Sequence, residues 1–255
     1  KEAQRLGYAE ADPTFDIEGV DAAHKLTLLA SLAFGIPVQF ERAYVEGISK
    51  LAADDIKLAE RLGYRIKLLG ITKRRPEGIE LRVHPALVPA KSMLANVEGA
   101  MNAVLIRGDA VGQTLYYGKG AGEEPTASAV VADLVDVTRL LNADPEHRVP
   151  HLAFQPDAMA DTPILSIDDV ISSYYLRMTV ADQPGVLADI ARVFSDGGIS
   201  IGSMIQQPSD ADGNADLVFL THEAVERNVN AAIAKIEAMP FVRSNVTRLR
   251  MESLS

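Results

Sequence analysis

The sequence has no cysteine, no surplus of positive charge and no long apolar run. The absence of cysteine excludes disulfides, thiolate nucleophiles and thiolate metal ligands, and it fits a reducing cytoplasm. The formal net charge of −10 argues against nucleic-acid binding, because a surface that follows phosphates needs clustered lysine and arginine. No stretch reaches the roughly 18 to 20 apolar residues that a membrane helix needs. We therefore expect a cytoplasmic protein whose partners are neither nucleic acids nor membranes.

The chain has 255 residues, of which 47% are hydrophobic, enough for one large domain or two ordinary ones. Its first residues, 1 to 6, resemble the end of a helix that Gly7 terminates. No initiator methionine and no helix start precede them. We therefore expect the chain to be a fragment of a longer protein.

The first 118 residues predict a mixed α+β unit with a substantial sheet. A polar loop leads to Gly19, and a helix is expected from Asp21 to Phe34. Its apolar positions predict a buried face formed by Ala22, Leu26, Leu29, Ala30 and Ala33. Alternating apolar and polar residues predict strands at 64–72, 79–84, 103–108 and 111–116, and a helix at 53–62.

The second half predicts a separate ferredoxin-like unit. A glycine-rich loop at 118–122 precedes a long helix of small residues, and the proline-containing segment 142–170 has the composition of a linker. Beyond it we expect strands at 174–180, 199–205, 216–221 and 242–251, with helices starting at Val186 and at Ala224. The resulting order is βαββαβ.

A cluster of acidic residues surrounds one lysine near the start of the chain. Asp21 and Lys25 are four residues apart, on one face of the predicted helix. This pair can be an ordinary surface ion pair worth a few tenths of a kcal/mol. Alternatively, a lysine on so apolar a helix can lie at a cleft, where burial and a carboxylate tune it for proton transfer. The other carboxylates would suit a substrate that carries an ammonium group.

The segment AQRLGYAEADPTFDIEGVDAAHK, from Ala3 to Lys25, resembles the signature of the homoserine dehydrogenase family. The resemblance implies that Glu10 binds the amino group of the substrate and that Asp16 helps to line the same pocket. It also implies that Asp21 and Lys25 lie beside the reacting oxygen, with Lys25 as the proton donor.

The resemblance implies an activity, the NAD(P)H-dependent reduction of L-aspartate 4-semialdehyde to L-homoserine. This step belongs to threonine, methionine and isoleucine biosynthesis. A lysine ammonium suits it, because hydride addition to an aldehyde leaves an alkoxide that needs stabilisation and a proton. Hydride itself requires NADP or NAD, and the sequence does not distinguish between the two.

The phosphate-binding motif G-x-G-x-x-G is absent from the chain. We therefore expect the nucleotide-binding domain to be missing and the chain to be inactive alone. The loop with Gly118, Gly120 and Gly122 can be a simple turn. Its similarity to the family pattern implies a contact with the cofactor, followed by a helix that returns to the nucleotide-binding domain over 118–141.

The sequence from Asp182 to Leu187, DQPGVL, resembles the first turn of an ACT domain. Gly185 would let a carboxylate approach the amides at the start of a helix. A regulatory amino acid, with threonine as the candidate effector, is therefore expected near Asp182, Gly185 and Ile205. Alternatively, the unit is an empty dimerisation module. ACT pairing and open strand edges favour a homodimer or homotetramer.

The predicted fold class is α+β, a mixed-sheet homoserine dehydrogenase catalytic domain followed by a ferredoxin-like ACT domain. We expect a substrate-binding domain at 1–145, a linker at 146–171 and the ACT domain at 172–255. The five histidines are scattered over different elements, so we predict no metal site.

Two alternatives to this enzyme stay open. One is a non-catalytic amino-acid sensor, in which the ACT unit binds ligand and the first domain only assembles oligomers. The other is a different dehydrogenase with an ACT tail, such as the phosphoglycerate type, which the run from Glu10 to Lys25 disfavours.

Overall fold

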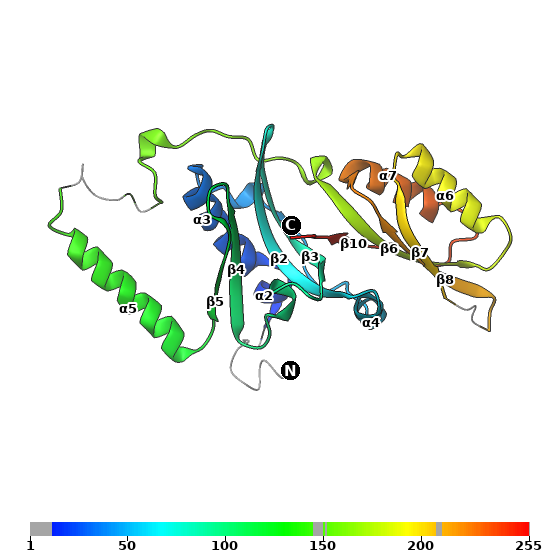
Figure 1. Cartoon of the computed structure of the whole chain (residues 1–255), viewed down its shortest axis with the longest axis horizontal. Coiled ribbons are helices and arrows are strands. Elements are labelled where there is room, and N and C mark those ends of the chain that lie inside the picture. Colours follow the sequence, from blue (N-terminus) through cyan, green and yellow to red (C-terminus); the bar gives the residue numbers. More distant parts are fainter. Residues whose placement is uncertain (1–11, 145–149, 151, 208–210, 255) are drawn as a thin grey trace.

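The computed structural model describes residues 12–144, 150, 152–207 and 211–254. Its first part is built on a long hairpin with helices beside it (Figure 1). The elements in chain order are α2 (Thr14–Ile17), α3 (Val20–Phe34), the 3-10 helix η1 (Phe40–Arg42), β1 (Tyr44–Val45), α4 (Ala53–Arg61), β2 (Tyr64–Arg75), β3 (Gly78–Pro89), the 3-10 helix η2 (Leu94–Asn96), β4 (Met101–Gly108), β5 (Gly112–Lys119) and α5 (Glu123–Leu140).

The second part is the predicted βαββαβ unit, preceded by two short 3-10 helices. Its elements are η4 (Pro156–Ala158), η5 (Ile167–Asp169), β6 (Ile171–Ala181), α6 (Val186–Asp196), β7 (Ile201–Gln206), β8 (Asn214–Thr221), β9 (Ala224–Val225), α7 (Glu226–Glu237) and β10 (Thr247–Met251). The strands lie in the order β10-β6-β8-β7, and each pairs antiparallel with its neighbour. The α+β class and the ferredoxin-like unit are thus confirmed.

Two boundaries in this unit differ from the prediction. Ala224 does not begin the helix but lies in β9, which pairs with Ser172 of β6. The last strand begins at Thr247 rather than at 242, and before it Val242 makes only an isolated bridge to Val180. Val242 and Val246 pack against the core, but the residues between them do not continue the strand ladder.

Helix α3 packs on β2 and β3, but its buried face is partly different from the predicted one. Leu26 and Ala30 are buried as expected, whereas Leu29 and Ala33 are exposed. The buried face is completed by the small side chains Ala23, Thr27 and Ser31. Small residues let the helix approach the sheet closely, and a Cβ built on Gly70 of β2 would lie 3.5 Å from Leu26. The leucines at 28, 29 and 32 are left on the outer side of α3.

Strand β3 is longer than predicted because it pairs with two different strands along one of its edges. It pairs with β1 at Arg82 and Val83, and with β10 at Ala86 and Leu87. Pro85 falls between these two pairings, where the missing N–H of a proline costs no ladder hydrogen bond.

Strand β10 joins the two parts of the chain in one eight-stranded sheet. It pairs antiparallel with β6 and parallel with β3. An apolar cluster crosses the same junction and contains buried residues from both parts: Leu58, Ala59, Leu87, Tyr175, Val218 and Leu249. The ferredoxin-like unit is therefore built into the sheet of the first part.

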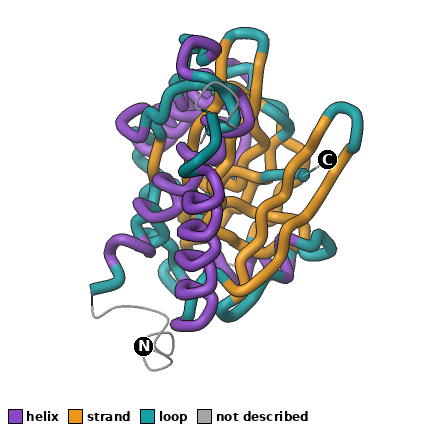
Figure 2. The backbone as a smooth tube through the Cα atoms, turned by 90° about the vertical axis from the view of Figure 1, so that its left-hand side faces the viewer, coloured by secondary structure: helices purple, strands orange, loops and turns teal. Residues whose placement is uncertain are grey.

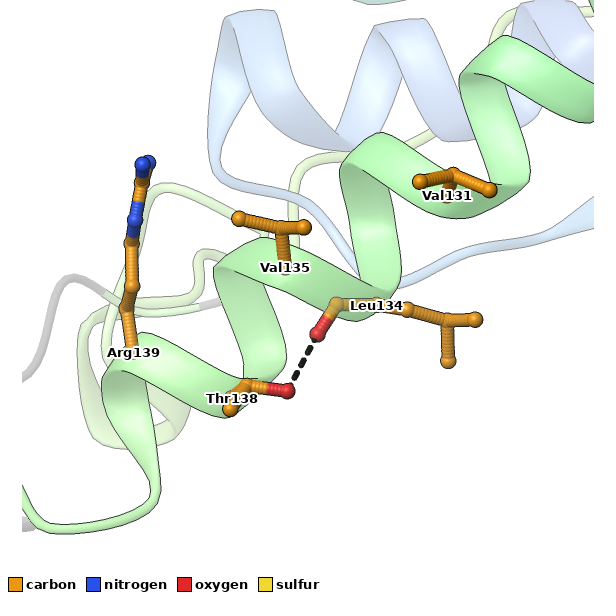
Figure 3. A pocket seen from close by; sticks show the side chains of 5 residues that line it. All are labelled: Val131, Leu134, Val135, Thr138 and Arg139. Atoms are coloured by element: carbon orange, nitrogen blue, oxygen red, sulfur yellow. Dashed lines mark hydrogen bonds between the residues drawn. The ribbon is translucent and has the colours of Figure 1, made fainter.

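Helix α5 lies apart from this sheet, beyond the separate β4–β5 hairpin (Figure 1); Figure 2 views the molecule from the side on which α5 lies. None of its residues is buried, and its apolar side chains are exposed. A shallow surface hollow on α5 is lined by Val131, Leu134, Val135, Thr138 and Arg139 (Figure 3). Over the described part of the chain, no helix is long and apolar enough to cross a membrane.

Candidate active site

The site begins with the turn that joins α2 to α3. Gly19 caps the N-terminus of α3 with a φ of 79°, in the left-handed region that favours glycine. A Cβ at Gly19 would lie 3.0 Å from Cγ1 of Val83 and 3.4 Å from Cγ1 of Val45. The turn is therefore pressed against β1 and β3, which fixes the start of α3.

Asp21 and Lys25 form the ion pair that the sequence predicted. Nζ of Lys25 donates to Oδ2 of Asp21 at 2.6 Å, one helical turn apart. The side chain of Lys25 is 65% exposed and that of Asp21 is 38% exposed. An exposed pair of this kind adds only about 0.3–0.5 kcal/mol to stability. The pair thus leaves an ammonium group accessible, with N–H groups to spare for an incoming oxygen.

Of the other two predicted substrate residues, the structure describes only Asp16. Asp16 is an exposed residue of α2, and its carbonyl accepts a hydrogen bond from the N–H of Gly19 at 3.1 Å. Asp16 thus belongs to the same turn that starts α3. Glu10 lies outside the described residues.

An aromatic stack beside the ion pair was not predicted. The ring of His24 lies between Phe15 and Phe40, with centroid distances of 5.8 Å and 4.0 Å. His24 precedes Lys25 directly in α3, and the stack joins α3 to Phe15 of α2 and to Phe40 of η1. No local sequence pattern predicts this stack, because His24 is nine residues from Phe15, beyond the three- or four-residue spacing at which helix neighbours meet.

The three predicted cofactor glycines lie at the end of β5 and in the short loop that leads to α5. Gly118 is the second-to-last residue of β5 and pairs with Asn102. The N–H of Gly120 donates to the carbonyl of Ala100 at 3.2 Å, and Gly122 caps α5 with a φ of 122°. Glu123 and Glu124 occupy the first turn of α5. Their charges disfavour a phosphate at this helix start, so the loop suits an uncharged part of a ligand.

The predicted regulatory residues lie at one end of the ferredoxin-like sheet. Gly185 is exposed and caps α6 with a φ of 96°. Oδ1 of Asp182 accepts a hydrogen bond from Nε2 of Gln206 at 3.1 Å, a contact between residues 24 positions apart that was not predicted. Ile205 packs partly on the apolar cluster shared with α4, next to its β-pairing partner Val218. The structure therefore brings Asp182 to Gln206, while the side chain of Ile205 faces the junction with α4.

Buried charges gather at the junction rather than at the exposed site. Arg82, Arg250, Glu80 and Glu226 are at most 2% exposed, and ion pairs link each to an opposite charge. No group of three His, Cys, Asp or Glu residues able to hold a metal ion occurs in the parts of the chain described above.

The fold and the site define a two-part α+β chain, in which a sheet region with a lysine–carboxylate pair is joined to a βαββαβ unit. A family model described as homoserine dehydrogenase matches residues 1–135, and one described as ACT domain matches residues 174–241. The chain belongs to the homoserine dehydrogenase family.

Individual relatives agree. A homoserine dehydrogenase of Pseudomonas aeruginosa is 59% identical over 255 residues, covering 100% of this chain and 59% of that protein. One of Neisseria gonorrhoeae is 57% identical and is covered to 58%. The crystal structure of a homoserine dehydrogenase from Thiobacillus denitrificans has a TM-score of 0.93 and 66% identity, covering 100% of this chain and 57% of that one. The chain thus spans somewhat more than half the length of these relatives.

Proposed function

We propose that this chain is the substrate-binding and catalytic region of a homoserine dehydrogenase that reduces L-aspartate 4-semialdehyde to L-homoserine. The observation that carries this proposal is the accessible Lys25–Asp21 pair on α3 in a chain of this family. The reaction would serve threonine, methionine and isoleucine biosynthesis, and a cytoplasmic location stays a prediction.

Lys25 would act as the proton donor. A bound nicotinamide cofactor, NAD or NADP, supplies the hydride for this chemistry. Lys25 would hold the aldehyde oxygen by a charge-assisted hydrogen bond and give it a proton as negative charge develops there. Asp21 would orient the ammonium group, and the exposure of Lys25 would let water return the proton afterwards.

Asp16 and Glu10 would hold the substrate by its amino group. A carboxylate recognises an ammonium group by a charge-assisted hydrogen bond. Asp16 supports this role by its exposure in α2, directly before the turn at Gly19.

The loop with Gly118, Gly120 and Gly122 would contact the cofactor near its neutral ring. A Cβ at Gly118 would meet nothing within 4 Å, which leaves room for a ligand there. The acidic first turn of α5 fits this assignment better than a pyrophosphate contact.

Helix α5 would pack on the part of the enzyme that the relatives have and this chain does not span. Its exposed valines and leucines form an apolar surface of the kind that a partner domain covers. Residues 118–141 would thus return to a nucleotide-binding domain, and this chain alone would have negligible catalytic activity. A homodimer or homotetramer is the proposed assembly.

The ACT unit would bind a regulatory amino acid, with threonine as the effector, near Asp182, Gly185 and Ile205. Calorimetry with threonine, serine and methionine tests this assignment, with Asp182→Ala as the variant and Asp196→Ala, an exposed residue at the far end of α6, as the control. We expect threonine binding that only Asp182→Ala weakens. Absence of binding by all three amino acids would leave the unit a structural module.

Steady-state kinetics of the natural full-length protein test the main proposal. Replacement of Lys25 by Ala should lower kcat roughly 10²- to 10⁴-fold, the range typical of a general acid. Lys57→Ala is the matched control, since Lys57 is another exposed helix lysine, 3.6 Å from an aspartate. Full turnover by the Lys25 variant would favour the non-catalytic amino-acid sensor instead.

A further inference from the structure

The segment after β1, residues 46–48, packs against the turn between α2 and α3. The N–H of Ile48 donates to the carbonyl of Ile17 at 2.9 Å. A Cβ on Gly47 would lie 2.5 Å from Cα of Glu18 and 2.7 Å from the Ile17 carbonyl oxygen. Gly47 and Ile48 therefore touch the backbone between α2 and α3, and position 47 has no space for a side chain. The position of this segment determines where the turn between α2 and α3 can lie.

Glu46 holds this segment in place. Its Oε2 accepts hydrogen bonds from Oη of Tyr44 at 2.7 Å and from Nη1 of Arg250 at 2.9 Å. Its N–H donates to the carbonyl of Val83 at 2.8 Å. Burial raises the pKa of the Glu46 carboxyl, but the Tyr44 hydrogen bond and the Arg250 charge outweigh burial and lower it overall. Glu46 therefore stays ionised.

The two cations that contact Glu46, Arg250 at 2.9 Å and Arg248 at 3.6 Å, both come from β10 of the ACT unit. Arg250 lies on β10 and is 1% exposed. Its Nε and Nη2 donate to the two carboxylate oxygens of Glu226, the first residue of α7, at 2.8 Å and 2.5 Å. Tyr174 Oη also donates to Glu226 at 2.8 Å. One buried guanidinium thus bonds a carboxylate from each part of the chain.

We propose that Glu46 is a positioning residue for the proposed active site, by which Arg250 of the ACT unit sets the turn carrying Asp16 and starting α3. This inference rests on the proposed function for its consequence, the placement of Asp21 and Lys25. The path runs through direct contacts from Glu226 to Arg250, to Glu46 and then through Gly47 and Ile48 to the turn.

A second junction ion pair provides a matched control. Asp55 of α4 accepts hydrogen bonds from Nε and Nη2 of Arg177 on β6 at 2.6 Å and 3.0 Å, and another from Tyr175 Oη. It resembles the Glu46 site in its chemistry and in linking the two parts of the chain, although the Asp55 side chain is 1% exposed and that of Glu46 is 25% exposed. It differs because its carboxylate lies on α4, whereas Glu46 lies in the segment that touches the turn between α2 and α3.

The test compares Glu46→Gln, Gly47→Ala and the control Asp55→Asn in the natural full-length protein. Glu46→Gln removes the charge at nearly constant volume, and Gly47→Ala displaces the turn without touching the ion pairs. Hydrogen exchange is read at residues 13–21 and steady-state kinetics are measured in parallel. We expect both test variants to speed exchange in the turn and to lower kcat/KM about 10- to 100-fold, since misplacement of about 1 Å costs on that order.

The Asp55→Asn variant should lower the melting temperature as Glu46→Gln does, with exchange at 13–21 and kcat/KM close to wild type. The inference is wrong if the control changes both readouts as much as the test variants, or if the test variants leave both unchanged. An inactive wild-type protein would count against the proposed function alone, because the exchange comparison would still decide whether Glu46 positions the turn.

Discussion

His84 accepts a hydrogen bond at Nε2 from Nη1 of Arg82, 2.5 Å away, in the interior of the sheet. Its Nδ1 donates to the carbonyl of Pro85 at 3.0 Å, so the arrangement requires a neutral imidazole. Burial, followed by the charges of Arg250 and Arg82, holds the pKa of His84 well below its usual value of 6.5.

This pKa predicts that the protein loses stability as the pH falls below about 6.5. The unfolded chain takes up a proton at His84 there and the folded chain does not, so the free energy of unfolding decreases by up to about 1.4 kcal/mol per pH unit. Urea denaturation between pH 7.5 and 5 measures the slope. The variant His84→Gln should remove this contribution, and an unchanged slope in the variant would show that other groups cause it.

A second pH effect is expected at lower pH. Burial raises the pKa of Glu252, but Arg82 and Lys73 outweigh burial and lower it. Stability from Glu252 is therefore complete above its unfolded pKa, near 4.5, and is lost as the pH falls through the lower folded value. Glu252→Gln should flatten the stability curve below pH 4.5 only, which distinguishes it from His84→Gln.

Gly19→Ala should destabilise the protein and disturb the proposed site together. Gly63→Ala is the control, because Gly63 has a similar φ of 82° but a Cβ there would meet nothing within 4 Å. The control should cost about 1–2 kcal/mol for the left-handed backbone alone. The Gly19 variant should cost about 1–3 kcal/mol more, because its Cβ would crowd Val83. If urea denaturation shows that both variants lose the same free energy of unfolding, the turn at Gly19 can shift to accommodate the added Cβ and the prediction is wrong.

The elements carried by local patterns could be predicted from the sequence. The helix from Asp21 to Phe34 and the βαββαβ order were confirmed, since periodicity and glycine terminators act within a few residues. The Asp21–Lys25 pair was predictable for the same reason, because one helical turn determines its geometry.

The junction could not be predicted in this way. Arg250 and Glu46 are 204 positions apart, and the pairing of β10 with β3 depends on tertiary packing that no local pattern encodes. The exposure of Leu29 was missed because periodicity identifies an apolar stripe but cannot tell which side meets the sheet. The predicted boundary at 146–171 and the roles of the site residues stay predictions.

The shared strand predicts that the two parts unfold together. Leu249 of β10 is 3% exposed and lies in the cluster that spans the junction, whereas Leu217 lies in the core between the ferredoxin-like sheet and its helices. Replacing either leucine by Ala should lower the free energy of unfolding by about 2–5 kcal/mol, because buried methyl groups are removed. Because β10 pairs with both β3 and β6, we expect calorimetry to give a single transition that both variants shift downward. If Leu217→Ala instead splits off an early transition while the rest of the melt stays in place, the ACT unit unfolds independently, and β10 does not couple it to the catalytic region.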